Sequence, residues 1–179
     1  MPYTIWITGL SASGKSTLGA GLSEHLVSLG VSCELLDGEA VRTRLDRVYG
    51  YSVEERNLVV HQIEHMAAEA MSSGKLAIVA TISHVSATRS AVRARLGRFF
   101  EIYLRCPPEV CAQRDRKGNY ARALRGELPN FIGVDEPYEE SSDPELIIDT
   151  SRLAALDTLA LAIQHIERRV LASSASSRS

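Results

Sequence analysis

The chain has 179 residues, 45% of them hydrophobic and 23% charged, and 20 Lys and Arg residues nearly balance 22 Asp and Glu residues, for a net charge of −2. This composition is typical of one globular domain, and it argues against disorder, a basic nucleic-acid-binding surface and an anionic-membrane partner. No apolar run approaches the roughly 18 residues of a membrane span and the first residues lack the basic region of a signal peptide, so we expect a cytoplasmic protein whose three cysteines stay reduced.

Short apolar runs alternate along the chain with stretches of helical periodicity. The apolar runs predict strands at residues 3–8, 33–36, 76–82, 99–104 and 146–148. The periodic stretches predict helices at residues 15–29, 52–73, 88–96 and 153–171, with a further helix opening at 107–108. This alternation predicts a five-stranded parallel sheet with helices on both faces, and residues 76–82 have the continuous apolar character of a central strand. We expect one domain over residues 1–171 and a disordered, Ser-rich tail over residues 172–179.

A phosphate-binding loop follows the first predicted strand directly. Residues 9–16 read Gly-Leu-Ser-Ala-Ser-Gly-Lys-Ser and match the pattern G-x-x-x-x-G-K-[ST] in full. In such a loop backbone N–H groups cradle the phosphates, Lys15 reaches the outer phosphates and the Ser16 hydroxyl binds Mg²⁺. The alternative is a glycine-containing surface turn that matches by chance. Because a strand precedes the loop and a helix follows it, the sequence predicts nucleoside triphosphate binding.

The class of nucleotide-binding protein follows from what else the chain contains. A regulatory GTPase needs an Asn-Lys-x-Asp segment, and no Asn-Lys pair occurs in this sequence. The chain is also short for a motor or a helicase. We therefore predict a small-molecule kinase, which needs a second substrate pocket, a carboxylate near the acceptor hydroxyl and a basic lid.

The sequence offers candidates for the carboxylate and the lid. Asp37 ends the second predicted strand, where it could orient or deprotonate an acceptor hydroxyl or hold Mg²⁺ through water, or form only an Asp-Gly turn. Residues 114–125 carry five cations and one acid and are either a solvated helix face or a lid with hinges at Gly118 and Gly126.

Two other clusters carry less functional information. One contains four arginines that we expect to be mostly solvated: Arg89, Arg93, Arg95 and Arg98. The other is the pair His61 and His65, four residues apart on one helix face with no third ligand evident, which disfavours a zinc site.

Six motifs in one order make the chain resemble the adenylylsulfate (APS) kinase family from about residue 4 to residue 150. Besides the phosphate loop and Leu36-Asp37-Gly38-Glu39, they are residues 106–111, 113–115, 117–120 and 131–139. The resemblance implies a P-loop nucleoside triphosphate hydrolase-like three-layer sandwich. It also implies transfer of the ATP γ-phosphate to the 3′-hydroxyl of adenosine 5′-phosphosulfate in sulfate assimilation, with Mg²⁺, by a homodimer.

The same resemblance implies roles for individual residues. Those matched to ATP binding are Gly9, Ser11, Ala12, Ser13, Gly14, Lys15, Ser16, Thr17 and, near the adenine, Arg114, with Ser16 also at the metal. Those matched to catalysis are Lys15, Asp37, Ser83 and the lid lysine Lys117. Those matched to acceptor binding are Asp37, Glu39, Arg42, Tyr51, Arg56, Val59, Ile82, Ser83, Lys117 and Phe131. Tyr51 and Phe131 would enclose the acceptor base between aromatic faces. Ser83 matches a serine labelled as a phosphorylated intermediate, although direct in-line transfer needs no covalent step.

The departures from the family pattern gather on the acceptor side. The family's Asn-hydrophobic-Arg-Arg reads Val59-Val60-His61-Gln62, and its Ile-Ser-Pro-Tyr reads Ile82-Ser83-His84-Val85. APS is the favoured acceptor, and the open alternatives are a changed acceptor such as cytidine diphosphoramidate or a non-catalytic nucleotide-binding module. An unrelated small-molecule kinase, such as one acting on a sugar acid, would share only the phosphate loop.

Overall fold

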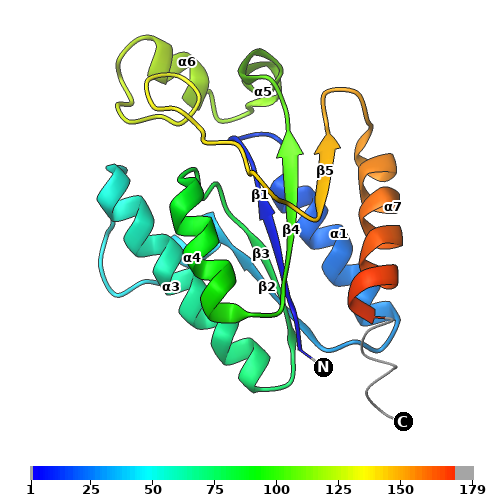
Figure 1. Ribbon diagram of the computed structural model, residues 1–179. Helices are drawn as coiled ribbons and strands as arrows, with labels where there is room; N and C mark the ends of the chain where they lie inside the picture. Colours follow the sequence, from blue (N-terminus) through cyan, green and yellow to red (C-terminus); the bar gives the residue numbers. More distant parts are fainter. Residues whose placement is uncertain (1, 172–179) are drawn as a thin grey trace.

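Five parallel strands form the sheet at the centre of the molecule. The structure is a computed structural model that describes residues 2–171, and Figure 1 shows its arrangement. The strands are β1 (Thr4–Thr8), β2 (Cys33–Asp37), β3 (Leu76–Ala80), β4 (Phe99–Arg105) and β5 (Leu146–Asp149). They lie in the order β2-β3-β1-β4-β5, and every neighbouring pair is parallel. The predicted α/β three-layer sandwich with a five-stranded parallel sheet is thus confirmed.

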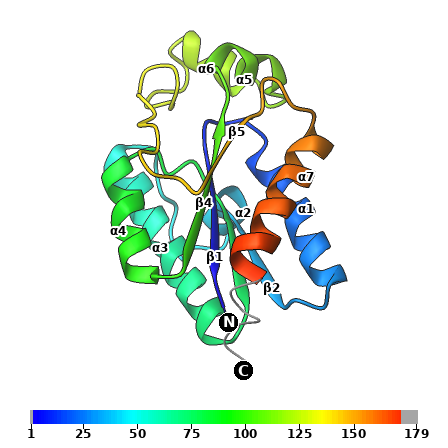
Figure 2. The same cartoon turned by 45° about the vertical axis from the view of Figure 1, so that its right-hand side comes forward.

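Helices cover both faces of the sheet and one of its ends. They are α1 (Lys15–Ser28), α2 (Gly38–Arg42), α3 (Val53–Ser72), α4 (Ser86–Leu96), α5 (Pro108–Arg114), α6 (Asn119–Leu124) and α7 (Ala155–Ile166). Figures 1 and 2 show α1 and α7 on one face, α3 and α4 on the other, and α5 and α6 beyond the carboxyl ends of the strands. The short helices α2 and α6 were not predicted, because a helix of five or six residues leaves too little periodicity to detect.

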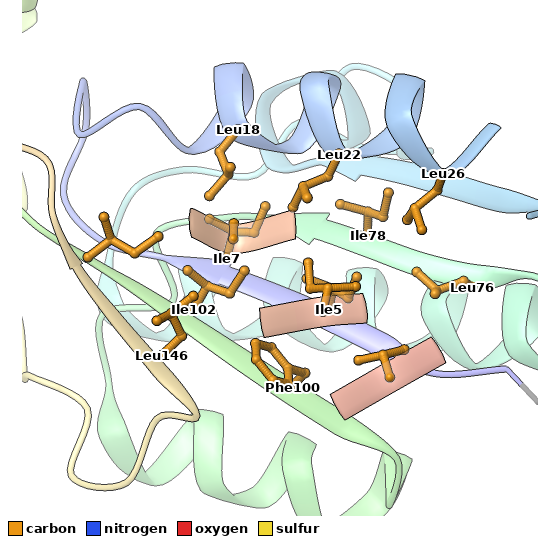
Figure 3. Packing of buried hydrophobic residues seen from close by; sticks show 14 of the residues in the cluster. Ile5, Ile7, Leu18, Leu22, Leu26, Leu76, Ile78, Phe100, Ile102 and Leu146 are labelled. Atoms are coloured by element: carbon orange, nitrogen blue, oxygen red, sulfur yellow. The ribbon is translucent and has the colours of Figure 1, made fainter. Parts of the chain in front are cut away.

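Alternate residues of β1 divide the core into two layers. Ile5 and Ile7 face α1, whose Leu18, Leu22 and Leu26 lie four residues apart and point toward the sheet (Figure 3). Trp6 points to the other side and packs in the cluster that α3 and α4 cover. Both faces of the strand are therefore buried, which explains its continuously apolar sequence.

Three predicted boundaries were wrong. The strand expected over residues 76–82 ends at Ala80, because the chain leaves the ladder before Ser83, whose φ is +38°. This strand, β3, lies beside the middle strand β1. The helix expected over residues 88–96 is α4 and begins at Ser86, two residues early, where the Ser86 N–H donates to the Glu139 carboxylate. The last helix ends at Ile166 and continues as a π-helical turn, Glu167–Leu171.

Two further expectations concern the chain as a whole. The tail predicted to be disordered, residues 172–179, lies outside the described residues. Within residues 2–171, none of the helices combines the length and apolar character required to cross a membrane.

Candidate active site

A cavity of about 1060 Å³ lies at the carboxyl ends of the strands. Its walls are the loop after β1, the turn after β2, the amino-terminal part of α3, the loop after β3 and the segment containing α5 and α6. Of the candidate residues, only Gly9 does not line this cavity. Residues from five of the six motifs thus share one site, at the sheet edge where ligands bind in open α/β folds.

The phosphate loop has the backbone geometry that its glycines permit. Gly9 has a φ of +143°, and a Cβ there would lie 2.6 Å from the carbonyl oxygen of Leu104. Gly14, with a φ of +104°, ends the loop, and α1 begins at Lys15 with its free N–H groups toward the cavity. The buried Ser13 hydroxyl has no hydrogen-bond partner within residues 2–171. Loop and helix start together form a concavity suited to an anion.

Lys15 is the cation of this concavity. Its Nζ donates to the Leu10 carbonyl oxygen at 2.6 Å, and burial lowers its pKa to about 8, an effect that nearby Cys111, Asp37 and Glu39 oppose. A buried ammonium held by a single neutral carbonyl gains strongly from a phosphate ligand.

Asp37 is the next residue along the cavity wall. Its Oδ1 accepts from the N–H groups of Glu39 and Ala40 at 3.0 and 3.3 Å and caps α2, which fixes the carboxylate. Its Oδ2 accepts from the Ser16 hydroxyl at 2.5 Å. The hydroxyl oxygen and the neighbouring carboxylate oxygen are hard oxygen ligands of the type that Mg²⁺ prefers. This pair therefore fits the metal that the phosphate-loop motif implies.

The basic segment forms one wall of the cavity and is not merely a solvated helix face. The Tyr120 hydroxyl donates to the Ser11 carbonyl oxygen at 3.1 Å, and its ring packs edge-to-face on Phe131. Lys117 forms an ion pair with Glu39 across the cavity. Arg114 lines the cavity too and donates to the Thr150 carbonyl oxygen at 2.8 Å. Tyr120 lies within the motif at residues 117–120 but had no predicted role, and no pattern in the sequence indicated Thr150.

Two arginines and an aromatic ring form the acceptor side of the cavity. The guanidinium carbons of Arg42 and Arg56 lie 4.7 and 5.1 Å from the centre of the Tyr51 ring. Both side chains donate only to backbone carbonyls, and neither forms an ion pair within the described residues. Burial, together with the charge of Arg42, lowers the pKa of Arg56 to about 10. The carboxylates of Asp135 and Glu136 oppose this lowering without forming an ion pair, so the two adjacent cations still make this wall favourable for an anion.

The other predicted acceptor residues line the same wall with different exposures. Phe131 is buried, whereas Tyr51 is about half exposed. Val59 is 3% exposed and belongs to the core cluster under α3, so its side chain also has a packing role.

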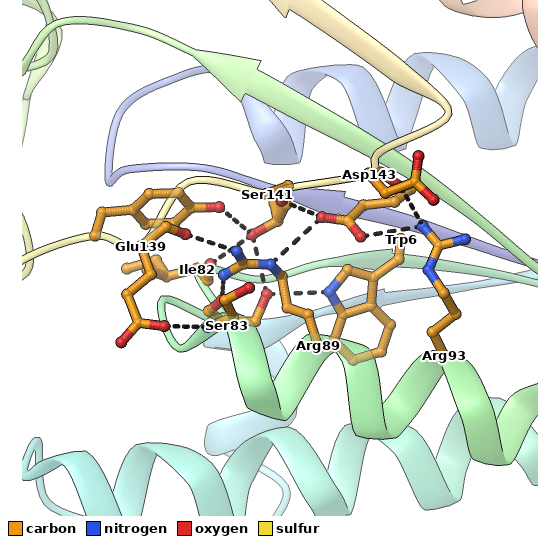
Figure 4. Close-up of polar contacts among 12 residues, drawn as sticks. Trp6, Ile82, Ser83, Arg89, Arg93, Glu139, Ser141 and Asp143 are labelled. Carbon is orange, nitrogen blue, oxygen red and sulfur yellow. Dashed lines mark hydrogen bonds and ion pairs between the residues drawn. The ribbon is translucent and has the colours of Figure 1, made fainter.

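Ser83 lines the cavity and belongs to a buried polar network (Figure 4). Its hydroxyl accepts from Trp6 Nε1 and lies 3.0 Å from the Thr8 hydroxyl. Its carbonyl oxygen accepts from Arg89 Nη1 at 2.6 Å, and Arg89 Nη2 donates to the Glu139 carbonyl oxygen, also at 2.6 Å. These bonds hold the loop after β3 in its strained conformation.

The expectation that the arginine cluster is mostly solvated was wrong for Arg89. This residue is 2% exposed and pairs with Glu101 at 3.4 Å. Arg93 pairs with Glu101 and Glu145, while Arg98 is exposed as expected. The carboxylate partners come from β4 and from the residue that precedes β5, so the spacing of the arginines alone gave no indication of them.

The fold and the site define a P-loop kinase of a small molecule, with a phosphate loop, a lid and a second subsite around one cavity. A family model described as adenylylsulphate kinase matches residues 1–149. The chain is 38% identical over 163 residues to an adenylyl-sulfate kinase of Synechococcus, covering 91% of this chain and 93% of that protein. It is 41% identical over 165 residues to the "Probable bifunctional SAT/APS kinase 2" of Sorangium cellulosum. This match covers 92% of the present chain and 28% of that longer protein.

Solved structures agree with the sequence comparisons. The structure of the Mycobacterium tuberculosis APS kinase CysC in complex with AMPPNP and APS superposes with a TM-score of 0.87 at 32% identity. The match covers 93% of this chain and 98% of that one. The chain belongs to the adenylylsulphate kinase family.

The buried network predicts unequal effects for two neighbouring arginines. Arg89→Met removes the cation of a buried pair and leaves Glu101 and two carbonyl groups without it, so we expect about 3–5 kcal/mol less unfolding free energy. The exposed Arg98→Met is the matched control, with a change within about 0.5 kcal/mol. Urea unfolding followed by circular dichroism measures both. Equal effects of the two substitutions would contradict the stabilising role of Arg89.

Proposed function

We propose that the chain is an ATP-dependent kinase that phosphorylates the 3′-hydroxyl of adenosine 5′-phosphosulfate (APS), giving 3′-phosphoadenosine 5′-phosphosulfate. One observation carries this proposal: a single cavity joins a complete phosphate loop to a wall with two unpaired arginines, and Asp37 lies between them. Family membership supports the choice of acceptor. The proposal takes residues 1–171 as one kinase domain and includes a homodimer and a cytoplasmic location, for which the family resemblance is the support.

The donor half of the cavity holds the ATP phosphates. The backbone of residues 9–17 surrounds them, with Ser11, Ala12, Ser13, Gly14 and Thr17 on the cavity wall. Lys15 exchanges its bond with the Leu10 carbonyl for the outer phosphates and stabilises the charge that develops during transfer. Arg114 lies near the adenine, as the family motif implies. Ser16 and Asp37 would hold Mg²⁺, which supplies further charge neutralisation to the phosphates when bound.

The acceptor half positions the hydroxyl that receives the phosphoryl group. Arg42 and Arg56 attract the anionic 5′ group, and Tyr51 and Phe131 enclose the base. The acceptor pocket is completed by Glu39, Val59, Ile82 and Ser83. Asp37 orients the 3′-hydroxyl and accepts its proton, and Lys117 on the lid neutralises charge on the moving phosphoryl group. Positioning and electrostatics account for catalysis of this kind.

Ser83 contributes to this mechanism through structure. Its hydroxyl is occupied by Trp6 and Thr8, and the residue is 5% exposed. A covalent phosphoserine step would have to break these bonds first. We therefore assign Ser83 to the architecture of the acceptor pocket and propose direct transfer between the two substrates.

Acceptor-dependent ADP release tests the function. The purified protein is incubated with Mg²⁺ and ATP and with APS, with cytidine diphosphoramidate, or with no acceptor. We expect release to require APS. Release with the cytidine compound alone would contradict the proposed acceptor, and release that no acceptor stimulates would favour the non-catalytic nucleotide-binding module.

Lys15→Ala tests the phosphate loop. We expect kcat to fall at least about 100-fold, because the cation that stabilises the transition-state charge is removed. Lys75→Ala is the matched control, since Lys75 pairs with Glu34 outside the cavity. Full activity in the Lys15 variant would remove the loop from the mechanism.

Asp37→Asn tests the carboxylate. Asparagine is as good a helix cap as aspartate, so α2 keeps its start while the site loses the negative charge and the proton acceptor. We expect kcat for APS phosphorylation to fall about 100- to 10,000-fold and the Kd for ATP to change less than about threefold. The exposed Asp46→Asn serves as the control. An unchanged kcat in the Asp37 variant would exclude the role given to this carboxylate.

A further inference from the structure

His84 is a buried polar side chain on the acceptor wall that nothing in the described structure satisfies. The residue is 5% exposed and lines the cavity beside Arg56. Its ring forms no hydrogen bond or ion pair within residues 2–171, and its nitrogens are not among the polar atoms sealed from solvent. The ring nitrogens are therefore open to the cavity without a partner among the described residues, which leaves them available to a ligand.

The backbone that carries this ring is held in place before any ligand binds. The His84 carbonyl oxygen accepts from the Glu139 N–H at 3.0 Å. The preceding carbonyl, that of Ser83, is held by buried Arg89 at 2.6 Å. The loop after β3 therefore carries His84 into the cavity wall on a well-held backbone, which lowers the cost of ordering this segment when a ligand binds.

The charges around His84 determine its protonation. Burial is the largest effect and lowers its pKa, and the positive charges of Arg56 from α3 and Arg89 from α4 act in the same direction. Glu139, in the segment before β5, opposes them. At neutral pH the free protein thus carries an uncharged imidazole with one N–H to donate.

The surroundings of the ring indicate what this N–H would meet. Arg56 and Arg42 give the wall a positive potential, and within the described residues no carboxylate pairs with either. An anionic oxygen attracted to the two guanidinium groups comes to the part of the wall where the His84 ring lies. The neutral imidazole can donate to that oxygen without adding to the repulsion between the arginines.

We propose that His84 is a specificity-determining residue that donates a hydrogen bond to the anionic 5′ group of the acceptor nucleotide. The inference rests on the proposed function and extends it, because it gives this chain a polar contact on the wall where Val59 and Val60 supply none. A site that is built to pair a buried donor discriminates against ligands that lack the matching oxygen.

Steady-state kinetics of two His84 variants test the proposal. We expect His84→Leu to raise the KM for APS about tenfold, with kcat and the KM for ATP within about twofold. His84→Gln retains an N–H donor and should restore the KM for APS to within about threefold of the wild-type value. His65→Leu, at an exposed position on α3, is the control and should behave as wild type. Thermal melting confirms that each variant is folded.

The pH dependence supplies a readout that a packing role would not move. An anion beside the ring favours its charged form, so the pKa of His84 rises when APS binds and binding takes up a proton. The wild-type KM for APS should therefore fall as the pH is lowered from 8 toward 6, and this slope should disappear in both variants.

Three results would overturn the inference, and they are distinguishable. An unchanged KM for APS in folded His84→Leu would refute it while wild-type turnover leaves the proposed function standing. Adenosine has no 5′ anion. If His84→Leu weakened competitive inhibition by adenosine as much as it raised the KM for APS, the ring would contact the base and not the 5′ group. Absence of any APS turnover by the wild-type protein would refute the proposed function and the inference with it.

Discussion

The parallel pairing of β1 with β3 on one side and β4 on the other determines where every functional residue lies. Parallel strands end at the same edge of a sheet, so the segments that follow β1, β2 and β3 meet there although they are far apart in the sequence. The hydrogen bond from Ser16 to Asp37 joins the first two segments, and the bonds of Ser83 to Trp6 and Thr8 fix the third. The site forms because the parallel strands bring these three segments to the same edge of the sheet.

Buried charge maintains the acceptor side of that edge. Arg89 is almost fully enclosed, yet its guanidinium reaches the Glu101 carboxylate and two backbone carbonyls, which offsets the cost of taking it out of water. Through these contacts one side chain ties together the loop after β3, strand β4 and the segment before β5. Arg42 and Arg56 on the cavity wall differ from Arg89. Within the described residues their side chains donate only to backbone carbonyl groups, so their charge stays available to a ligand.

The sequence predicted those features that local chemistry determines. The five strands and the phosphate loop each depend on neighbouring residues, and the structure has all of them. The end of β3 was misplaced, because Ile82 is apolar but packs in the cluster beneath the lid. The burial of Arg89 could not be predicted, since its carboxylate partner lies on another strand. The absence of a hydrogen-bond partner for the His84 ring among the described residues was likewise unpredictable, because its neighbours come from segments far apart in the sequence.

The donor and acceptor halves of the cavity are built by different means. Backbone geometry supplies most of the donor half, whereas the proposed acceptor half consists largely of side chains, among them Arg42, Arg56 and His84. Substitutions can therefore change acceptor recognition while the phosphate loop stays intact. This division explains how a chain of the adenylylsulphate kinase family can keep its phosphate-transfer residues and still depart from the family pattern around the acceptor.

Phosphorus NMR of the protein with Mg²⁺, ATP and APS tests the central claim, direct transfer to the acceptor 3′-hydroxyl, most directly. The account predicts that the ATP γ-phosphorus signal is replaced, one for one, by a phosphomonoester signal coupled to the ribose 3′ proton. Formation of inorganic phosphate alone, or of an ester at another position, would contradict it.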